Sequence, residues 1–211
     1  MTIIAVVGTG TEVGKTYVTA ALVRALRDRG ISVVARKPVL SYAPGDTATD
    51  ADVLAAATGE DPNAVCPPHR RLALAMAPPM AADALDAPPF TIADLAGETL
   101  ATVPAGGLAL VETAGGVRSP LAADGDSGAL VDALHPVLVV LVADAGLGTI
   151  NLVRMSLDAL RGHTVCTMLN RYDAADELHR RNADWLRDET KADIVTSVDA
   201  LAGRVELAPS G

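Results

Sequence analysis

The chain has 211 residues, a length that suits one α/β domain over 1–211, because a second core would leave both halves small. Half of the residues are apolar but only 2% are aromatic, so the core must be built from Ala, Val and Leu. The net charge of −9 argues against nucleic-acid binding, because no basic stripe is present to neutralise phosphates.

Two further features bear on location. No signal peptide is visible and no apolar segment reaches the roughly 20 residues that span a membrane, so we expect a cytoplasmic protein that does not bind membranes. Cys66 and Cys166 lie far apart and show no metal-ligand spacing. We therefore predict two reduced, packed thiols rather than a disulfide or a metal site.

Apolar runs punctuated by turn residues predict alternating strands and helices. Strands are expected at 2–7, 31–36, 107–112, 137–143 and 164–169, and helices at 17–29, 51–58, 92–102, 129–134, 150–160 and 174–190. The Pro-rich stretch at 66–89 is expected to be an irregular connection with one short helix. Right-handed crossovers then give a doubly wound, mainly parallel sheet with helices on both faces, whose strand C-terminal ends gather the site.

The first strand runs into residues 8–16 (GTGTEVGKT), and a helical pattern follows. Strand, glycine-rich loop and helix are the parts of a phosphate-binding loop, in which Lys15 reaches the terminal phosphates and the Thr16 hydroxyl ligates magnesium. Gly8 lies six residues before Gly14 where the usual pattern has five, so this loop is one residue longer. The alternative is a plain glycine-rich turn with a surface lysine. We expect a nucleoside triphosphate to bind along Glu12, Val13, Gly14, Lys15, Thr16 and Tyr17.

Charged residues follow the second predicted strand. Lys37 is aimed at the same crevice, where its charge could stabilise phosphoryl oxygens or a carboxylated intermediate, although a solvated lysine is the alternative. Beyond it, Asp46, Asp50 and Asp52 approach the start of a helix. Helix capping and metal binding both suit these carboxylates, and the pattern leaves the two open.

An acid ends the third predicted strand. Glu112 follows a run of apolar residues and precedes a glycine pair, so it is placed to hold magnesium beside the phosphate loop. A solvent-exposed carboxylate is the alternative.

The last two predicted strands end in small and polar residues. The loop at 143–151 opens a helix, which makes either a carboxylate site or a plain turn. Asn170 ends the fifth strand and suits the edge of a nucleobase, a weak signal by itself.

Four segments together resemble the dethiobiotin synthetase family over roughly residues 2–170: 8–16 (GTGTEVGKT), 37–41 (KPVLS), 111–116 (VETAGG) and 147–151 (LGTIN). The family's long phosphate loop accounts for the extra residue. The resemblance implies a phosphate-loop NTPase fold and a homodimeric ligase of biotin synthesis. Such an enzyme uses ATP and Mg²⁺ to carboxylate 7,8-diaminononanoate and close a cyclic urea through carbamate and carbamoyl-phosphate intermediates.

The resemblance also implies roles for single residues. Lys37, Lys15, Thr11 and Ser41 would be catalytic. Thr16, Asp50 and Glu112 would hold magnesium, with Asp50 preferred to Asp52. The substrate would contact Thr11, Glu12 and Ser41, its tail carboxylate would meet Gly148, Thr149 and Asn151 across the dimer interface, and adenine would meet Asn170.

The chain departs from the family pattern at Thr113, Tyr42 and Pro79, and the final strand region, 193–201, lacks the Pro-containing loop used around the base. The resemblance places Thr113 and Tyr42 close to the diamine and its carbamate, so these two departures bear on substrate identity, and the one at 193–201 bears on base selectivity. Two alternatives are a paralogue acting on another amine and a nucleotide switch of the partitioning-ATPase type. A switch would be expected to carry a second loop lysine, and between Gly8 and Lys15 there is none.

Overall fold

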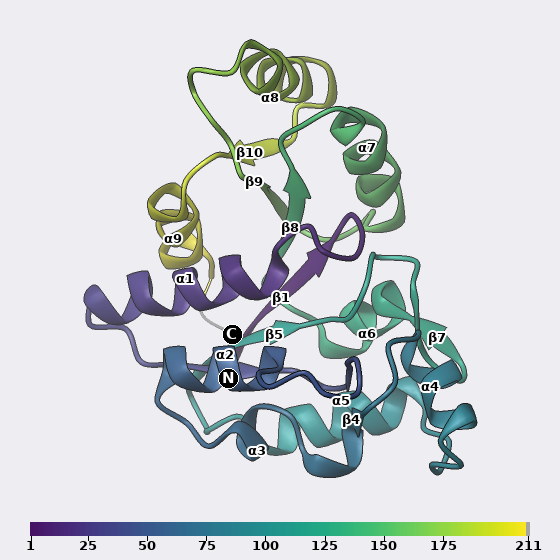
Figure 1. Ribbon diagram of the computed structural model, residues 1–211. Helices are drawn as coiled ribbons and strands as arrows, with labels where there is room; N and C mark the ends of the chain where they lie inside the picture. The colour runs from purple at the N-terminus through teal and green to yellow at the C-terminus, as the bar shows by residue number, and fades with distance from the viewer. Residues whose placement is uncertain (210–211) are drawn as a thin grey trace.

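The computed structural model describes residues 1–209 and is organised around one six-stranded sheet (Figure 1). The strands are all parallel, in the order β10-β9-β8-β1-β5-β2. Their bounds are β1 Thr2–Gly8, β2 Val33–Arg36, β5 Leu108–Glu112, β8 Leu138–Asp144, β9 Val165–Asn170 and β10 Asp193–Val195. From β1 the chain passes to the edge strand β2, returns to β5 beside β1, and then continues through β8, β9 and β10 on the other side of β1. The direction of strand addition therefore changes at β1, where ligands of such sheets bind.

Helices cover both faces of the sheet. α1 (Lys15–Asp28) packs between α2 (Asp50–Thr58) and α9 (Val198–Leu207) on one face, and Figure 1 shows α9 and α1 along the same side of the strands. The other face carries α5 (Ile92–Ala101), α6 (Ser127–Leu134), α7 (Thr149–Ala159) and α8 (Glu177–Thr190). The shorter elements are β3 Leu40–Ser41, α3 Pro62–Val65, η1 Pro68–Arg70, β4 Arg71–Leu72, α4 Pro78–Ala84, β6 Pro120–Ala122 and β7 Gly125–Asp126.

The central strand, β1, is apolar at odd and even positions alike because helices cover both of its faces. Ile4 and Val6 pack into the cluster under α1, whereas Ala5 and Val7 pack into the cluster under α6 and α7. Because side chains alternate across a strand, a strand covered on both faces needs a continuous apolar run rather than an alternating one. The predicted parallel α/β sheet with helices on both faces is confirmed.

Several element boundaries differ from the sequence prediction. α1 begins at Lys15 rather than residue 17, and α8 begins at Glu177 rather than 174, because the Asp176 side chain caps it by accepting from two backbone N–H groups. The segment 66–89 holds a 3₁₀ turn, a short strand and α4, more structure than expected. β10 lies within the final strand region expected at 193–201, whereas α9, which begins inside the same range, was missed. Within residues 1–209, no helix combines the length and apolar character needed to cross a membrane.

Both cysteines are free and buried, as the sequence predicted. Burial raises the pKa of the Cys66 thiol to about 11. Burial, with the nearby Asp193 carboxylate, raises the pKa of Cys166 to about 12. With these raised pKa values, both thiols stay protonated at physiological pH. Because the thiolate is the reactive form, both groups are expected to be unreactive.

We expect neither thiol to react with an aromatic disulfide reagent in the native protein at pH 8. A pKa near 11 leaves only about one thiol in a thousand ionised at that pH, and the side chains are enclosed. The thiol count follows from the absorbance of the released thiolate, with two equivalents released after unfolding in guanidinium. Rapid release of one equivalent from the native protein would contradict this burial, and Cys66→Ser would identify the reactive group.

Candidate active site

The loop between β1 and α1 has the backbone that an anion site requires. Gly14 caps α1 with φ 91°, where side chains are strained, and a Cβ there would lie 2.1 Å from Asn170 Nδ2. Gly14 has no side chain to cap α1, so the first backbone N–H groups of that helix remain available to a ligand. The Lys15 ammonium folds back over the loop and donates to the Gly10 carbonyl at 2.9 Å. The long loop therefore closes around its own lysine.

Lys15 is electrostatically primed for an anion. Its burial, together with the charge of Lys37, lowers its pKa to about 8, although Glu112 and Asp50 oppose the shift. A negatively charged ligand at the loop would offset both the desolvation and the repulsion between the two lysines. The geometry and the charge of Lys15 thus favour phosphate oxygens at the same place.

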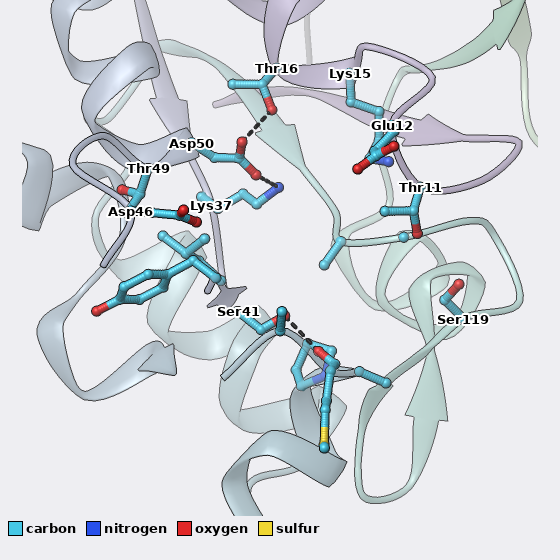
Figure 2. A pocket seen from close by; sticks show the side chains of 18 of the residues that line it. Thr11, Glu12, Lys15, Thr16, Lys37, Ser41, Asp46, Thr49, Asp50 and Ser119 are labelled. Carbon is cyan, nitrogen blue, oxygen red and sulfur yellow. Dashed lines mark hydrogen bonds and ion pairs between the residues drawn. The ribbon is translucent and has the colours of Figure 1, made fainter. Parts of the chain in front are cut away.

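Below the loop, four segments bring five polar side chains together. Thr16 Oγ1 lies 2.8 Å from both Asp50 Oδ1 and Glu112 Oε1. Lys37 Nζ donates to Glu112 Oε1 at 2.7 Å and pairs with Asp50 Oδ2 at 2.8 Å, and Figure 2 shows Asp50 between Thr16 and Lys37. The second Glu112 oxygen accepts from Thr19 Oγ1 at 2.7 Å. Every carboxylate oxygen named here has a partner.

Burial decides between the alternatives left open at two positions. Glu112 is fully buried and Lys37 is 2% exposed, so neither is a solvated surface residue. Burial by itself would lower the pKa of Lys37, but Glu112 and Asp50 outweigh it and raise the pKa above the usual value. Burial would raise the pKa of Asp50, and Lys37 and Thr16 outweigh that effect and lower it. Lys37 and Asp50 are therefore both ionised at neutral pH.

The two aspartates at the start of α2 occupy different environments. Asp52 Oδ2 accepts from the Thr49 N–H at 2.8 Å and from the Thr49 hydroxyl at 2.7 Å, which forms a capping box. Asp50 instead faces Thr16 and Lys37. One hydroxyl and two carboxylates then make a set of hard oxygens that suits magnesium. Within residues 1–209 no three His, Cys, Asp or Glu side chains form a metal cluster.

A cleft of about 870 Å³ opens beside this cluster. Thr11 and Glu12 lie on its phosphate-loop side, and Ser41 lies across the space from them (Figure 2). The Ser41 hydroxyl donates to the Met76 carbonyl at 2.6 Å, which ties β3 to the segment before α4. Lys15, Thr16, Lys37 and Asp50 also line the cleft. The structure thus gathers around one space most residues that the sequence assigned to catalysis and metal.

The departures from the family pattern lie in or beside this cleft. Tyr42 lines it, and so does Pro78, which precedes Pro79 at the start of α4. Thr113 is buried behind Lys37, whose ammonium donates to the Thr113 carbonyl at 3.2 Å. Of these positions, Tyr42 is the one whose side chain a ligand in the cleft would meet.

A second cavity of about 530 Å³ lies on the other side of the loop. Tyr17 and Asn170 line it, together with Tyr172 and residues 196–198 before and at the start of α9. The Asn170 amide donates to the Val13 carbonyl at 3.0 Å, so the backbone of Val13 holds Asn170 against the phosphate loop. The residues predicted to contact the nucleotide are therefore shared between the two cavities.

The predicted tail-carboxylate residues stand apart. Gly148, Thr149 and Asn151 form the N-terminus of α7 and line neither cavity of this chain. Leu147 beside them is 91% exposed, and Leu152 and Met155 on α7 are also exposed. These residues do not join Thr11 and Ser41 within one protomer.

Sequence reasoning missed two residues. Thr19 anchors Glu112, and the available signal was its position one helical turn after Thr16 on the same face of α1. Arg171 lines both cavities, and its adjacency to Asn170 was the signal.

Comparison with known proteins identifies the family. A family model described as "AAA domain" matches residues 2–203. The chain is 37% identical to the ATP-dependent dethiobiotin synthetase BioD of Haloferax mediterranei, over 97% of this chain and 90% of that protein. It is 36% identical to the enzyme of the same name from Rhodococcus jostii, over 100% of this chain and 92% of that protein. The chain belongs to the dethiobiotin synthetase family. The predicted membership and the prediction of an ATP-dependent ligase are confirmed.

Solved structures support the fold of this dethiobiotin synthetase family member. The signal recognition particle receptor FtsY of Elizabethkingia anophelis in complex with GDP matches with a TM-score of 0.57 at 16% identity, covering 93% of this chain and 58% of that one. A DUF1611 family protein from Anabaena variabilis also matches at 0.57, with 18% identity, covering 98% of this chain and 57% of that one. The chain spans less than two thirds of these structures, and the likeness concerns the fold alone.

Replacing each of the two aspartates of α2 separately tests which of them belongs to the predicted magnesium site. We expect Asp50→Asn to raise the magnesium concentration needed for half-maximal ATP turnover, because it removes an anionic oxygen next to Thr16. Asp52→Asn is the matched control, since its side chain caps α2 and faces Thr49. Initial rates over a magnesium titration measure both variants. A metal requirement that shifts with Asp52 and not with Asp50 would refute this assignment.

Proposed function

We propose that this protein forms dethiobiotin from 7,8-diaminononanoate, CO₂ and ATP in the presence of Mg²⁺. The observation that carries the proposal is Lys37, a buried cation at the end of β2 that is held between Asp50 and Glu112. A phosphate-loop ATPase already has its loop lysine, here Lys15. A second lysine beside the cleft supplies charge at the place where a carboxylated substrate would meet the terminal phosphate.

The reaction asks the protein to position and neutralise. One substrate amine takes up CO₂ as a carbamate, and a carbamate oxygen attacks the γ-phosphorus of ATP with ADP leaving. The second amine then attacks the carbonyl carbon and displaces phosphate, which closes the urea ring. Because both nucleophiles come from the substrate, alignment and charge stabilisation are the main contributions of the chain.

Individual residues have defined tasks in this scheme. Lys15 and Lys37 face the phosphoryl group from the loop and from β2, and both bear on the charge that gathers during transfer. Thr16, Asp50 and Glu112 would hold the magnesium ion, which supplies further neutralisation of phosphate charge. Thr11, Glu12 and Ser41 line the space for the diamine and its carbamate.

The tail of the substrate calls for a second protomer. We place its carboxylate at Gly148, Thr149 and Asn151 of the partner subunit in a homodimer, since these residues do not line the cleft of their own chain. Support comes from the exposed apolar side chains beside them, Leu147 and Met155, which a second copy would cover.

Direct turnover tests the proposed reaction. The purified protein is incubated with ATP, Mg²⁺, ¹³C-labelled bicarbonate and 7,8-diaminononanoate, and mass spectrometry follows the product. We expect a cyclic urea that carries the label in its carbonyl. ATP hydrolysis without a labelled urea from this diamine would refute the substrate assignment, and a labelled product from another diamine would identify a paralogue.

Lys37→Gln separates chemistry from nucleotide binding. We expect ATP affinity, measured by calorimetry, to stay within a few-fold of wild type, while the rate of urea formation falls by roughly two orders of magnitude because charge stabilisation at the transition state is lost. Lys191→Gln is the matched control, since it removes the same charge from an exposed position after α8. Equal losses of affinity and rate in Lys37→Gln would instead make Lys37 a nucleotide ligand.

A further inference from the structure

Two consecutive residues at the end of β9 bind consecutive carbonyl groups of the phosphate loop. Asn170 donates to the Val13 carbonyl at 3.0 Å, and Arg171 Nη2 donates to the Glu12 carbonyl at 2.8 Å. The other terminal nitrogen of Arg171 pairs with Asp144 Oδ2 at 2.7 Å. Asp144 is itself anchored, because its second oxygen accepts from the Gly146 N–H. The guanidinium therefore spans from the end of β8 to the loop.

The backbone of Arg171 is unusual. Its φ is 56°, in the left-handed region that residues other than Gly, Asn and Asp seldom adopt. A strained residue persists where its surroundings hold it, and such residues concentrate at ligand sites. Here the two side-chain bonds and the neighbouring Asn170 contact fix the turn.

Arg171 also occupies the boundary between the two cavities. Gly14 and Arg171 line both the cleft that contains Lys15 and the cavity that contains Tyr17 and Tyr172. Since Gly14 has no side chain, Arg171 supplies the one side chain, within residues 1–209, that faces both cavities. A ligand with phosphates at Lys15 and a base in the second cavity must pass it.

We propose that Arg171 is the stacking platform for the base of the bound nucleoside triphosphate, an inference that rests on the proposed use of ATP. Its two terminal nitrogens are held by Asp144 and by the Glu12 carbonyl, and the side chain is still 59% exposed beside the second cavity. A guanidinium is planar, weakly hydrated and stacks on π-faces. Stacking reads the ring face and no edge, so the contact holds purine bases of either kind.

Calorimetry with three ligands tests the platform. Mg-ATP, Mg-GTP and magnesium tripolyphosphate share the triphosphate, and the last has no base. We expect Arg171→Ala to weaken ATP and GTP alike by about tenfold, the size of one lost base-stacking contact, and to leave tripolyphosphate within twofold of wild type. Arg171→Lys keeps the charge but loses the plane, so the same loss is expected.

Two control variants accompany these. Arg161→Ala removes an exposed arginine that pairs with Asp158 and lines neither cavity, and it should bind all three ligands like wild type. Asp144→Asn keeps the Glu12 contact and removes only the anionic partner, so it should weaken ATP less than Arg171→Ala does. Melting temperatures report whether each variant is folded.

Three results would overturn the proposal. An equal loss of tripolyphosphate and ATP affinity in Arg171→Ala would make the residue a brace for the loop. Recovery of ATP affinity in Arg171→Lys would mean that Arg171 acts through its positive charge and not through its planar group. Unchanged affinity in Arg171→Ala would make it a surface residue without a role in binding. Wild-type protein that binds ATP but forms no cyclic urea would refute the proposed function alone and leave these comparisons intact.

Discussion

The buried pairing of Lys37 with Glu112 is the constraint around which the site is organised. An ion that leaves water costs several kcal/mol, and only a close partner with further hydrogen bonds offsets that cost. Glu112 meets this condition through Lys37, Thr16 and Thr19, and Lys37 meets it through Glu112, Asp50 and a carbonyl. The ends of β2 and β5 and the starts of α1 and α2 must therefore come together for the fold to be stable. The same contacts build the core and the active site.

The charges in this cluster balance. Lys15 and Lys37 face Asp50 and Glu112, two cations against two carboxylates, and the lysines respond in opposite directions. Lys37 has both acids in contact and its pKa rises, whereas Lys15 lacks such a contact and its pKa falls. Lys15 is therefore the cation that gains most from a phosphate, whereas the charge of Lys37 is already matched by the two acids beside it.

Sequence patterns predicted those parts of the site that depend on local structure. An apolar run that ends in glycines predicted the first strand and the phosphate loop. The positions of Lys37 and Glu112 at the ends of predicted strands indicated that both lie at the site. The choice between Asp50 and Asp52 was beyond the residues' own pattern, because it depends on how Thr49 caps α2 and turns one acid inwards. The cleft wall around Met76 was not predicted, because it comes from a Pro-rich stretch without apolar periodicity. The bounds of β10 were not predicted either, because this strand is only three residues long. Arg171 was missed because its adjacency to Asn170 did not show that its side chain lines both cavities, and an arginine does not mark a left-handed turn in the sequence.

The strand order divides the chemistry into two sides. From β1, the chain places β5 and β2 on one side, with Glu112 and Lys37 at their ends, and β8 and β9 on the other, with Asp144 and Asn170 at theirs. In the proposed function, a triphosphate lying across the loop after β1 would point its terminal phosphate towards the two acids and Lys37, and its nucleoside towards Asn170 and Arg171. Changes in residues 196–198 can thus alter the fit of a base while the groups that serve phosphoryl transfer stay in place. The reversal of strand order at β1 thus puts the two cavities on opposite sides of the loop, and the start of α1 and Arg171 are the parts that they share.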